Sequence, residues 1–416
     1  MDRRQFLLSA AAGSLAWAAG APFVAAAPFR KKAVIVGGGV AGSILALDLK
    51  RRVPEADVVL VEREAEFFLA AASVDVAVGA FDMRAAMRGY HHLANRGIQV
   101  VRAEAQGVDP KAGLLQTSAG PIPYSLLAIA SGIRLAFEEI PGLKDDPGAN
   151  LSFYDRTALP ALQKGLADMK GGNVIVSVPA GALRCPPAPY EFALRVADLM
   201  TARRLEGKVI LIDGWPSPQP EAIGKALAAE IAARGERIEY IPQTTVGKVD
   251  PKGRKVTTDF DQFDYEILTL TPPTKGGSLV AELGLADKGD VFAAVDYLTL
   301  RSKAHENIFV LGDAARVPYG KSGTAAVGQA RLCAAEMAHS LDGFGRTIRQ
   351  GEVQVSCYHA VRPGAALRLS TGYRSTRKPD GGVDVMVRAE AGTRPDPANE
   401  FARLSWHREI LWEIGG

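Results

Sequence analysis

The strongest structural signal in the sequence is Lys32-Ala33-Val34-Ile35-Val36 followed at once by Gly37-Gly38-Gly39-Val40-Ala41-Gly42. The first five residues form a short stretch that is apolar and mostly β-branched after Lys32, as in a buried parallel strand. The glycines fit a tight turn at Gly37, close approach of a pyrophosphate at Gly39, and close packing of helix on strand at Gly42. A helical pattern over 43–52 then offers free N–H groups to phosphate. The stretch predicts a dinucleotide-binding unit.

Glu62 closes the second strand of this unit. Residues 58–61 are a further apolar run, and Glu62 follows them about 20 residues after Gly42. A carboxylate in that place binds a pair of ribose hydroxyls. The order of strand, glycine turn, helix, strand and acid is a much stronger signal than a glycine-rich turn alone.

Two later stretches favour FAD over NAD as the nucleotide. Residues 124–132, which end at Gly132, resemble the strand and small-residue turn that close the FAD domain of flavoproteins with two dinucleotide domains. Residues 307–314, which include Gly312 and Asp313, resemble a late strand of the same proteins. There an aspartate carboxylate bonds a ribityl hydroxyl of the flavin. These stretches predict Gly132, Gly312 and Asp313 as FAD-binding residues.

The composition describes an ordinary globular protein of two or three domains. The chain has 416 residues, of which 47% are hydrophobic and 23% charged. This composition excludes a disordered tail, a collagen-like repeat and a small disulfide scaffold. The formal net charge of +3 argues against a nucleic-acid binder, which usually has a strongly basic domain. No metal site is predicted.

Residues 1–27 have the pattern of an export signal. Arg3 and Arg4 precede an apolar, alanine-rich run that ends in the small residues 25–27. The arginine pair followed by Phe6 and Leu7 is typical of the bacterial twin-arginine route for folded proteins. An uncleaved membrane anchor or an amphipathic arm is the alternative. We expect a periplasmic mature protein without stable membrane insertion, because no other apolar stretch is long enough to span a bilayer.

The middle of the chain repeats the strand and helix rhythm without a second glycine fingerprint. Strands are expected at 173–178 and 208–212, with a helix at 189–203 between them. The turn after the first of these strands, residues 179–187, has one glycine and two consecutive prolines. Such a turn is a poor pyrophosphate site. We expect a dinucleotide-domain architecture here that binds no NAD(P).

The three cysteines are Cys185, Cys333 and Cys357. Two of three cysteines are expected to pair in an oxidising compartment. Cys333 lies in a helical stretch among apolar neighbours and is expected in the core. Cys185 and Cys357 are expected in loops or at the ends of elements, where a disulfide fits. Spacing alone leaves a structural disulfide and a redox-active one equally open.

The residues around Cys185 carry a specific resemblance. Arg184-Cys185-Pro186-Pro187-Ala188-Pro189-Tyr190-Glu191 resembles the Cys-Pro-Pro-Gly-Pro-Tyr-Glu signature of the flavoprotein subunit of flavocytochrome c sulfide dehydrogenase. The resemblance covers nearly the whole mature chain. It includes the glycine turn, the export signal, residues 312–314, 321–323 and 356–358, and Trp406.

The resemblance implies roles for five residues. Cys185 and Cys357 correspond to two cysteines that form a redox-active disulfide beside the flavin, and Trp406 to an aromatic residue near it. Glu191 corresponds to the acid of the motif and is a general acid or base, unless it is a solvated carboxylate at a helix start. Lys321 supplies positive charge near the reduced flavin, unless it is simply a surface lysine.

One position departs from the family. In several members a cysteine after the second strand binds the flavin covalently, and here Ala70 occupies the comparable place. We therefore expect non-covalent FAD. The departure also leaves the match in redox potential and substrate open, because a covalent link alters the electronics of the flavin.

The implied reaction is thiol–disulfide exchange coupled to flavin. Sulfide attacks the Cys185–Cys357 disulfide, a persulfide and a thiolate result, and two electrons pass to the flavin. They then leave singly to a c-type cytochrome on another polypeptide, because this chain has no Cys-x-x-Cys-His motif. Two alternatives are a sulfide:quinone reductase and a non-enzymatic accessory flavoprotein of a sulfur-oxidising complex. The first normally needs an amphipathic membrane-binding tail, for which 406–414 is a short and partly acidic candidate.

The expected fold class is α/β, with two Rossmann-like domains arranged as in glutathione reductase. The FAD domain is expected from two pieces, 28–150 and 285–343, with a second Rossmann-like domain at 151–284 between them. A C-terminal interface region is expected at 344–416.

Overall fold

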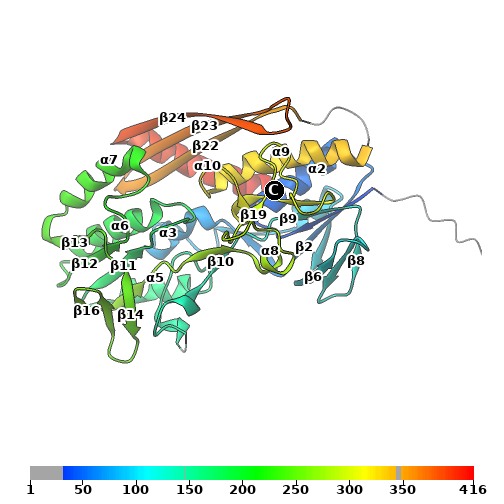
Figure 1. Cartoon of the computed structure of the whole chain (residues 1–416). Coiled ribbons are helices and arrows are strands. Elements are labelled where there is room, and N and C mark those ends of the chain that lie inside the picture. The colour runs from blue at the N-terminus through cyan, green and yellow to red at the C-terminus, as the bar shows by residue number, and fades with distance from the viewer. Residues whose placement is uncertain (1–30, 145, 343–347) are drawn as a thin grey trace, which may run out of the picture. The chain divides into compact units, whose positions relative to one another are not determined.

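A computed structural model describes residues 31–144, 146–342 and 348–416 (Figure 1). The predicted export signal at 1–27 lies outside these residues, so export stays a prediction. Within the described ranges, no helix combines the length and the apolar character needed to cross a membrane.

The first sheet grows from the predicted nucleotide-binding unit. It has five parallel strands in the order β20-β9-β1-β2-β5. Nearly every residue of its central strands is buried, because helices cover both faces of a parallel sheet. The strands are β1 (Lys32–Val36), β2 (Asp57–Glu62), β5 (Gln99–Arg102), β9 (Leu126–Ile129) and β20 (Ile308–Val310).

Helices α2 (Val40–Arg52) and α9 (Gly323–Asp342) pack against each other beside this sheet (Figure 1). Smaller elements surround it, including one two-stranded and one three-stranded antiparallel sheet. These elements are β3 (Glu66–Phe68), α3 (Ser73–Ala77), β4 (Met87–Gly89), α4 (His91–Asn95), β6 (Ala105–Asp109), β7 (Leu114–Thr117), β8 (Ile122–Pro123) and β10 (Ile133–Leu135).

The second sheet is also parallel, with the strand order β13-β12-β11-β17. Its strands are β11 (Val174–Val178), β12 (Val209–Asp213), β13 (Ile238–Ile241) and β17 (Ile267–Thr269). Helices α5 (Leu159–Asp168), α6 (Ala188–Ala202) and α7 (Glu221–Ala232) accompany it, and β14 (Val246–Asp250), β15 (Lys255–Thr258) and β16 (Gln262–Asp264) form an antiparallel sheet before β17. Short β18 (Thr274–Gly276), α8 (Ser278–Glu282) and β19 (Ala293–Ala294) lead back to the first sheet, and β21 (Ala315–Arg316) follows its last strand, β20.

The predicted α/β fold class with two Rossmann-like sheets is confirmed. The domain boundaries remain a prediction, since Lys31–Gly416 forms one compact unit. The largest apolar cluster joins both sheets, and it contains Ile35 and Phe309 from the first as well as Val176 and Leu211 from the second. Ile175, Ile210 and Leu268 of the second sheet belong to a separate cluster.

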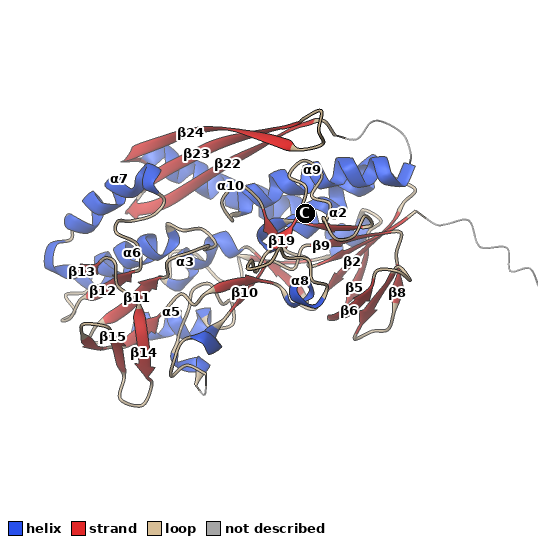
Figure 2. Cartoon of the chain, viewed as in Figure 1, coloured by secondary structure: helices blue, strands red, loops and turns tan. Residues whose placement is uncertain are grey.

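The C-terminal region is a three-stranded antiparallel sheet followed by a helix. Strands β22 (Gln350–Arg362), β23 (Ala365–Arg377) and β24 (Val383–Asp396) pair in chain order. Helix α10 (Pro397–Gly415) starts at Asp396, whose carboxylate accepts the Ala398 N–H at 2.7 Å. Figure 2 shows the three strands side by side, and β22 packs on α6, α9 and α10.

Cys357 lies inside β22, so its predicted position in a loop or at the end of an element is wrong. Residues 352–357 alternate polar and apolar side chains, which is the pattern of a half-buried strand, and the expectation did not take this into account. Pairing with β23, which follows directly after a turn at 363–364, and packing on α9 stabilise this strand.

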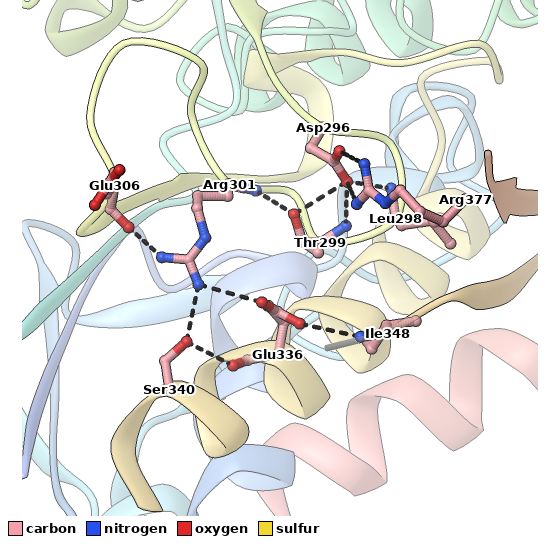
Figure 3. Close-up of polar contacts among 9 residues, drawn as sticks. All are labelled: Asp296, Leu298, Thr299, Arg301, Glu306, Glu336, Ser340, Ile348 and Arg377. Carbon is pink, nitrogen blue, oxygen red and sulfur yellow. Dashed lines mark hydrogen bonds and ion pairs between the residues drawn. The ribbon is translucent and has the colours of Figure 1, made fainter. Parts of the chain in front are cut away.

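Charged side chains tie this sheet to the loop before β20 (Figure 3). Arg377 at the end of β23 donates from both terminal guanidinium nitrogens to the carboxylate of Asp296 in that loop. The distance from its Nη2 to Asp296 Oδ1 is 2.8 Å. Arg301 of the same loop reaches α9, where it lies 3.2 Å from Glu336 and 2.8 Å from Ser340. The loop therefore links the first sheet to the C-terminal strands.

Candidate active site

A cavity of about 240 Å³ lies where the glycine turn of the first sheet, the β11–α6 loop, β22 and α10 meet. Most of the predicted site residues contribute to its wall. These are Gly39, Gly132, Cys185, Glu191, Gly312, Asp313, Cys357 and Trp406. Gly37, Gly42, Glu62 and Lys321 are outside the wall.

The three fingerprint glycines do different work in the turn. Gly37 has a φ of +100°, and a side chain there would strike the Ala130 carbonyl oxygen at 2.5 Å. A Cβ on Gly42 would overlap the Gly37 carbonyl oxygen, so this glycine permits the close packing of α2 on the turn. A Cβ on Gly39 would meet no atom within 4 Å, and this residue lines the cavity.

Glu62 stabilises the glycine turn through hydrogen bonds to its backbone. Its carboxylate accepts N–H groups from Gly38 at 2.5 Å and from Glu64 at 2.8 Å. Tyr90 packs on Gly38 and donates its hydroxyl to the Gly38 carbonyl at 3.1 Å. Glu62 thus holds the loop and leaves part of its carboxylate free for another donor.

Asp313 is a half-buried carboxylate directed at the cavity. It follows Gly312, whose φ of +70° turns the chain and whose N–H donates to Gln329 at 2.8 Å. Burial raises the pKa of Asp313, with Arg184 and Lys321 opposing it, and no described residue donates a hydrogen bond to its side chain. Together with the open surfaces at Gly39 and Gly132, this unpartnered acceptor fits the hydroxyls and phosphates of FAD.

Cys185 sits in the loop between β11 and α6 in a strained conformation. Its φ is +49°, a region that non-glycine residues rarely adopt. The Cys185 N–H donates to the Lys321 carbonyl at 2.8 Å, and the Cys185 carbonyl accepts from the Tyr154 hydroxyl at 3.3 Å. Strain of this kind persists only where the surroundings enforce it, and it often marks a functional residue.

Cys185 and Cys357 both line the cavity as thiols, and Cys333 is a buried thiol elsewhere. The predicted Cys185–Cys357 disulfide therefore stays a prediction for the oxidised protein. Burial raises the pKa of Cys185, and the charge of Cys357 raises it further. The two sulfurs are close enough to influence each other electrostatically.

His359 is a site residue that the sequence reasoning missed. Burial lowers its pKa, but interactions with Cys357 and Glu191 outweigh burial and raise the pKa to about 9. Burial alone would raise the pKa of Cys357, whereas His359, Ser322 and Thr324 together bring it below the usual value. At neutral pH these shifts favour an imidazolium beside a thiolate.

Glu191 is buried in the first turn of α6 and faces this pair. Its Oε2 lies 3.3 Å from His359 Nδ1. Its Oε1 lies 3.8 Å from Arg195, one turn along the same helix. The alternative interpretation of Glu191 as a solvated carboxylate is therefore wrong.

A buried ionic chain continues from Glu191 into two further helices. Arg195 bonds Asp75 on α3, and Asp75 also binds Arg403 on α10, where one contact measures 3.1 Å. Burial raises the pKa of Asp75, but the charges of Arg403 and Arg195 outweigh it and lower the pKa. No local pattern predicts these contacts, although His359, two residues after Cys357, would share its face if both lie in one strand.

Lys321 lies beside the cavity wall and not in it. Its Nζ donates to the carbonyls of Asp313 at 2.7 Å and Ala315 at 3.0 Å, and it lies 3.6 Å from the ring centre of Phe292. Burial lowers its pKa to about 8. Lys321 is thus no ordinary surface lysine, and its predicted role near the flavin stays a prediction.

Trp406 and Ala70 occupy the cavity wall at other points. Trp406 on α10 packs on Gly323 at the start of α9, where a Cβ would lie 2.5 Å from the indole ring. Ala70 begins a short 3₁₀ turn, Ala70–Ala72, and brings no thiol to the cavity.

In the second sheet, the acid that corresponds in position to Glu62 is bonded to other groups of the protein. Asp213 ends β12, where an acid binds ribose in dinucleotide domains. It is fully buried and accepts hydroxyls from Tyr190 at 2.7 Å and Tyr240 at 2.8 Å, and the Trp215 N–H at 2.9 Å. This carboxylate is committed to internal donors.

Comparison with solved structures identifies the fold. The chain is similar to the sulfide:quinone oxidoreductase from the hyperthermophilic bacterium Aquifex aeolicus, with a TM-score of 0.74, 19% identity, and coverage of 92% of this chain and 91% of that one. It is also similar to the ferredoxin reductase for the CYP199A2 system from Rhodopseudomonas palustris, with a TM-score of 0.67, 17% identity, and coverage of 92% and 94%. The chain has the fold of the FAD/NAD(P)-binding oxidoreductases.

Sequence comparisons agree with that fold. Residues 159–272 match a protein-family model described as "Sulfide dehydrogenase [flavocytochrome c] flavoprotein chain, central". The chain is 24% identical to the mitochondrial sulfide:quinone oxidoreductase of Dictyostelium discoideum, over 75% of this chain and 74% of that protein. It is 25% identical to the enzyme of the same name from Mus musculus, over 72% and 69%. These findings support a FAD-dependent disulfide oxidoreductase and do not single out the flavocytochrome c subunit.

Proposed function

We propose that this protein is a FAD-dependent oxidoreductase that oxidises sulfide through Cys185 and Cys357. The observation that carries the proposal is that both cysteines line the same cavity as Asp313, whose carboxylate accepts no hydrogen bond from the described residues. Sulfide is the substrate named for the curated relatives, which supports it as the substrate class here.

The residues of the cavity suit a small anionic sulfur donor. Arg184 and Arg403 line the wall, and His359 adds a positive charge at neutral pH. Buried cations of this kind attract hydrosulfide more effectively than the small net charge of the chain. Gly39, Gly132 and Asp313 would hold FAD, which when bound accepts the two electrons that sulfide oxidation releases.

The pKa directions of the two cysteines predict which sulfur is attacked. A disulfide breaks more readily toward the thiol of lower pKa, and that thiol is Cys357. Hydrosulfide therefore attacks the Cys185 sulfur. The S–S bond breaks, Cys185 carries a persulfide, and Cys357 leaves as a thiolate. Glu191, bonded to His359, is placed to exchange the proton of the incoming sulfur.

For the electron acceptor, we favour a quinone over a c-type cytochrome. The curated relatives and one of the solved structures are sulfide:quinone oxidoreductases by name. A c-type cytochrome is the second candidate, since the family model that matches 159–272 describes a flavocytochrome c chain. Export by the twin-arginine route is part of this proposal, and a non-enzymatic accessory role is the alternative to it.

Anaerobic titration with sulfide tests the cysteine mechanism. We expect sulfide to bleach the flavin absorbance of the purified holoprotein, and Cys185→Ser and Cys357→Ser to abolish bleaching. Cys333→Ala is the matched control and should bleach like the wild type, because Cys333 is buried outside the cavity. Bleaching that survives in both serine variants would show the disulfide mechanism to be wrong.

Steady-state assays decide the acceptor. We expect sulfide-dependent reduction of a short-chain ubiquinone analogue. Reduction of cytochrome c alone would favour the flavocytochrome c reading. Reduction of neither, with partner binding retained, would favour the accessory role.

A further inference from the structure

His359 and Cys357 share one face of β22. They are two residues apart in a strand, so both side chains point to the same side, and both line the cavity. The His359 side chain is only 2% exposed. A charge on either group is therefore shielded from water and depends on its neighbours.

Glu191 fixes the orientation of the imidazole. Nδ1 of His359 donates to the Glu191 carboxylate at 3.3 Å, whereas Nε2 is buried and makes no hydrogen bond within the part of the chain that the structure describes. A ring with one nitrogen anchored and the other unsatisfied has a donor available for an anion in the cavity.

Glu191 is itself held in place by a chain of ion pairs. Arg195 contacts both Glu191 and Asp75, and Asp75 in turn binds Arg403. Arg403 and Asp75 are each less than one-tenth exposed. Because α3, α6 and α10 each contribute to this chain of ion pairs, the carboxylate that anchors His359 has little freedom to swing away.

Several charged and titratable residues surround Cys357 and His359. His407 on α10 is neutral at pH 7, because burial and the charge of Arg403 lower its pKa to about 4. It therefore adds no competing positive charge. The others that line the cavity with the pair are Glu191 on α6, Arg403 on α10, Tyr358 on β22, and Asp313, Arg184, Cys185 and Tyr154. Tyr373 on β23 packs near Cys357, and Arg195 and Asp75 lie behind Glu191.

We propose that His359, held by Glu191, is a positioning residue that keeps the Cys357 sulfur as a thiolate once the disulfide is open. The inference rests on the proposed function for its role in turnover: the imidazolium balances the charge that Cys357 acquires when the S–S bond breaks. No oxidant or reductant beyond that step is required. The ion pair itself is a property of the reduced protein and can be measured without turnover.

The test is the pH profile of alkylation. Reduced holoprotein is treated with iodoacetamide from pH 5 to 10, and the Cys357 and Cys185 peptides are quantified separately by mass spectrometry. In the wild type we expect the Cys357 rate to rise with an inflection well below about 8.5, the value of a free cysteine. In His359→Gln, which keeps a donor for Glu191, we expect the inflection to rise by at least about one unit and the rate at pH 7 to fall about tenfold.

His305→Gln is the matched control, because His305 is outside the cavity wall, and it should leave the profile unchanged. Glu191→Gln provides a second variant, in which the inflection should also rise. If His359→Gln fails to fold, as judged by circular dichroism and FAD content, Glu191→Gln decides alone. A wild-type profile in the folded variants would overturn the proposal. A low Cys357 inflection without sulfide-dependent bleaching would instead overturn the proposed function and leave the ion pair standing.

Discussion

At the scale of single residues, the glycines of the fingerprint are needed for two different reasons: one for packing within the protein and one for room beside a ligand. Gly42 is needed by the protein itself, because a side chain there overlaps the backbone of Gly37. Gly39 has an extended backbone with a φ of −67° that alanine also adopts, and open space beside it. Only a ligand in the cavity requires Gly39 to lack a side chain.

Gly39→Ala and Gly42→Ala should therefore fail in different ways. We expect Gly39→Ala to unfold within about 0.5 kcal/mol of the wild type and to bind FAD at least about tenfold more weakly. Gly42→Ala should lose stability and soluble yield. Thermal unfolding of the apoproteins and fluorescence titration with FAD check both outcomes. A Gly39→Ala protein with wild-type FAD affinity would contradict the assignment of this surface to the nucleotide.

His407 makes the fold sensitive to acid. Its pKa is lowered to about 4 in the folded protein, while an unfolded chain takes up the proton near 6.5. The stabilisation is therefore complete above pH 6.5 and is lost as the pH falls from 6.5 to about 4. The full loss amounts to about 3 kcal/mol.

We expect His407→Leu to flatten the decline in unfolding free energy between pH 6.5 and 4, measured by urea denaturation. The exposed His91, changed to Gln, serves as the control and should decline like the wild type. Equal slopes in His407→Leu and the wild type would show that His407 is not the group responsible.

At the scale of elements, the C-terminal strands depend on side-chain anchors as well as on backbone pairing. Arg377 and Arg374 both belong to β23, but their surroundings differ. The Arg377 side chain is 17% exposed in its pair with Asp296, whereas Arg374 is 65% exposed and 3.6 Å from Glu352. Partly buried ion pairs with several hydrogen bonds contribute more than exposed ones.

Arg377→Gln should therefore lower the free energy of unfolding by about 1–3 kcal/mol, because it leaves the Asp296 carboxylate without its main partner. Arg374→Gln should change it by less than about 0.5 kcal/mol. Chemical denaturation of both variants gives the comparison, and equal effects would contradict the anchoring role shown in Figure 3.

The same region shows where sequence patterns stop being informative. The nucleotide unit was predictable, because β1, the glycine turn and α2 are consecutive and each carries its own pattern. In β22, residues 352–357 alternate polar and apolar side chains as in a half-buried strand, and residues 363–364 turn directly into β23. That pattern was overlooked, and Cys357 was misplaced for that reason. The packing of β22 on α6, which brings His359 to Glu191, has no local pattern, so His359 was missed.

At the scale of the whole molecule, the cavity has the walls of a FAD site without a thiol at Ala70. We therefore expect precipitation of the holoprotein with trichloroacetic acid to release all of the flavin into the supernatant. Flavin that stays with the precipitated protein would show covalent attachment at another residue.

In the second sheet, the carboxylate at the end of β12, Asp213, already accepts hydrogen bonds from protein groups. Because Asp213 is committed to Tyr190 and Tyr240, we expect NADH and NADPH to leave the flavin oxidised under anaerobic conditions in which sulfide bleaches it. Rapid bleaching by either nucleotide would contradict this interpretation of Asp213.

Those parts of this protein that depend on interactions between neighbouring residues can be predicted from short stretches of sequence. The strand, glycine turn, helix and acid from Lys32 to Glu62 specify a nucleotide-binding unit, and the Cys185 segment carries its own signature. The chemistry around Cys357 depends instead on contacts that form when the chain folds. Glu191 and His359 are 168 residues apart in sequence, and burial against three helices makes their 3.3 Å contact strong enough to set the charge of a sulfur. Burial and long-range contact are properties of the folded chain, so no short stretch of residues reveals them.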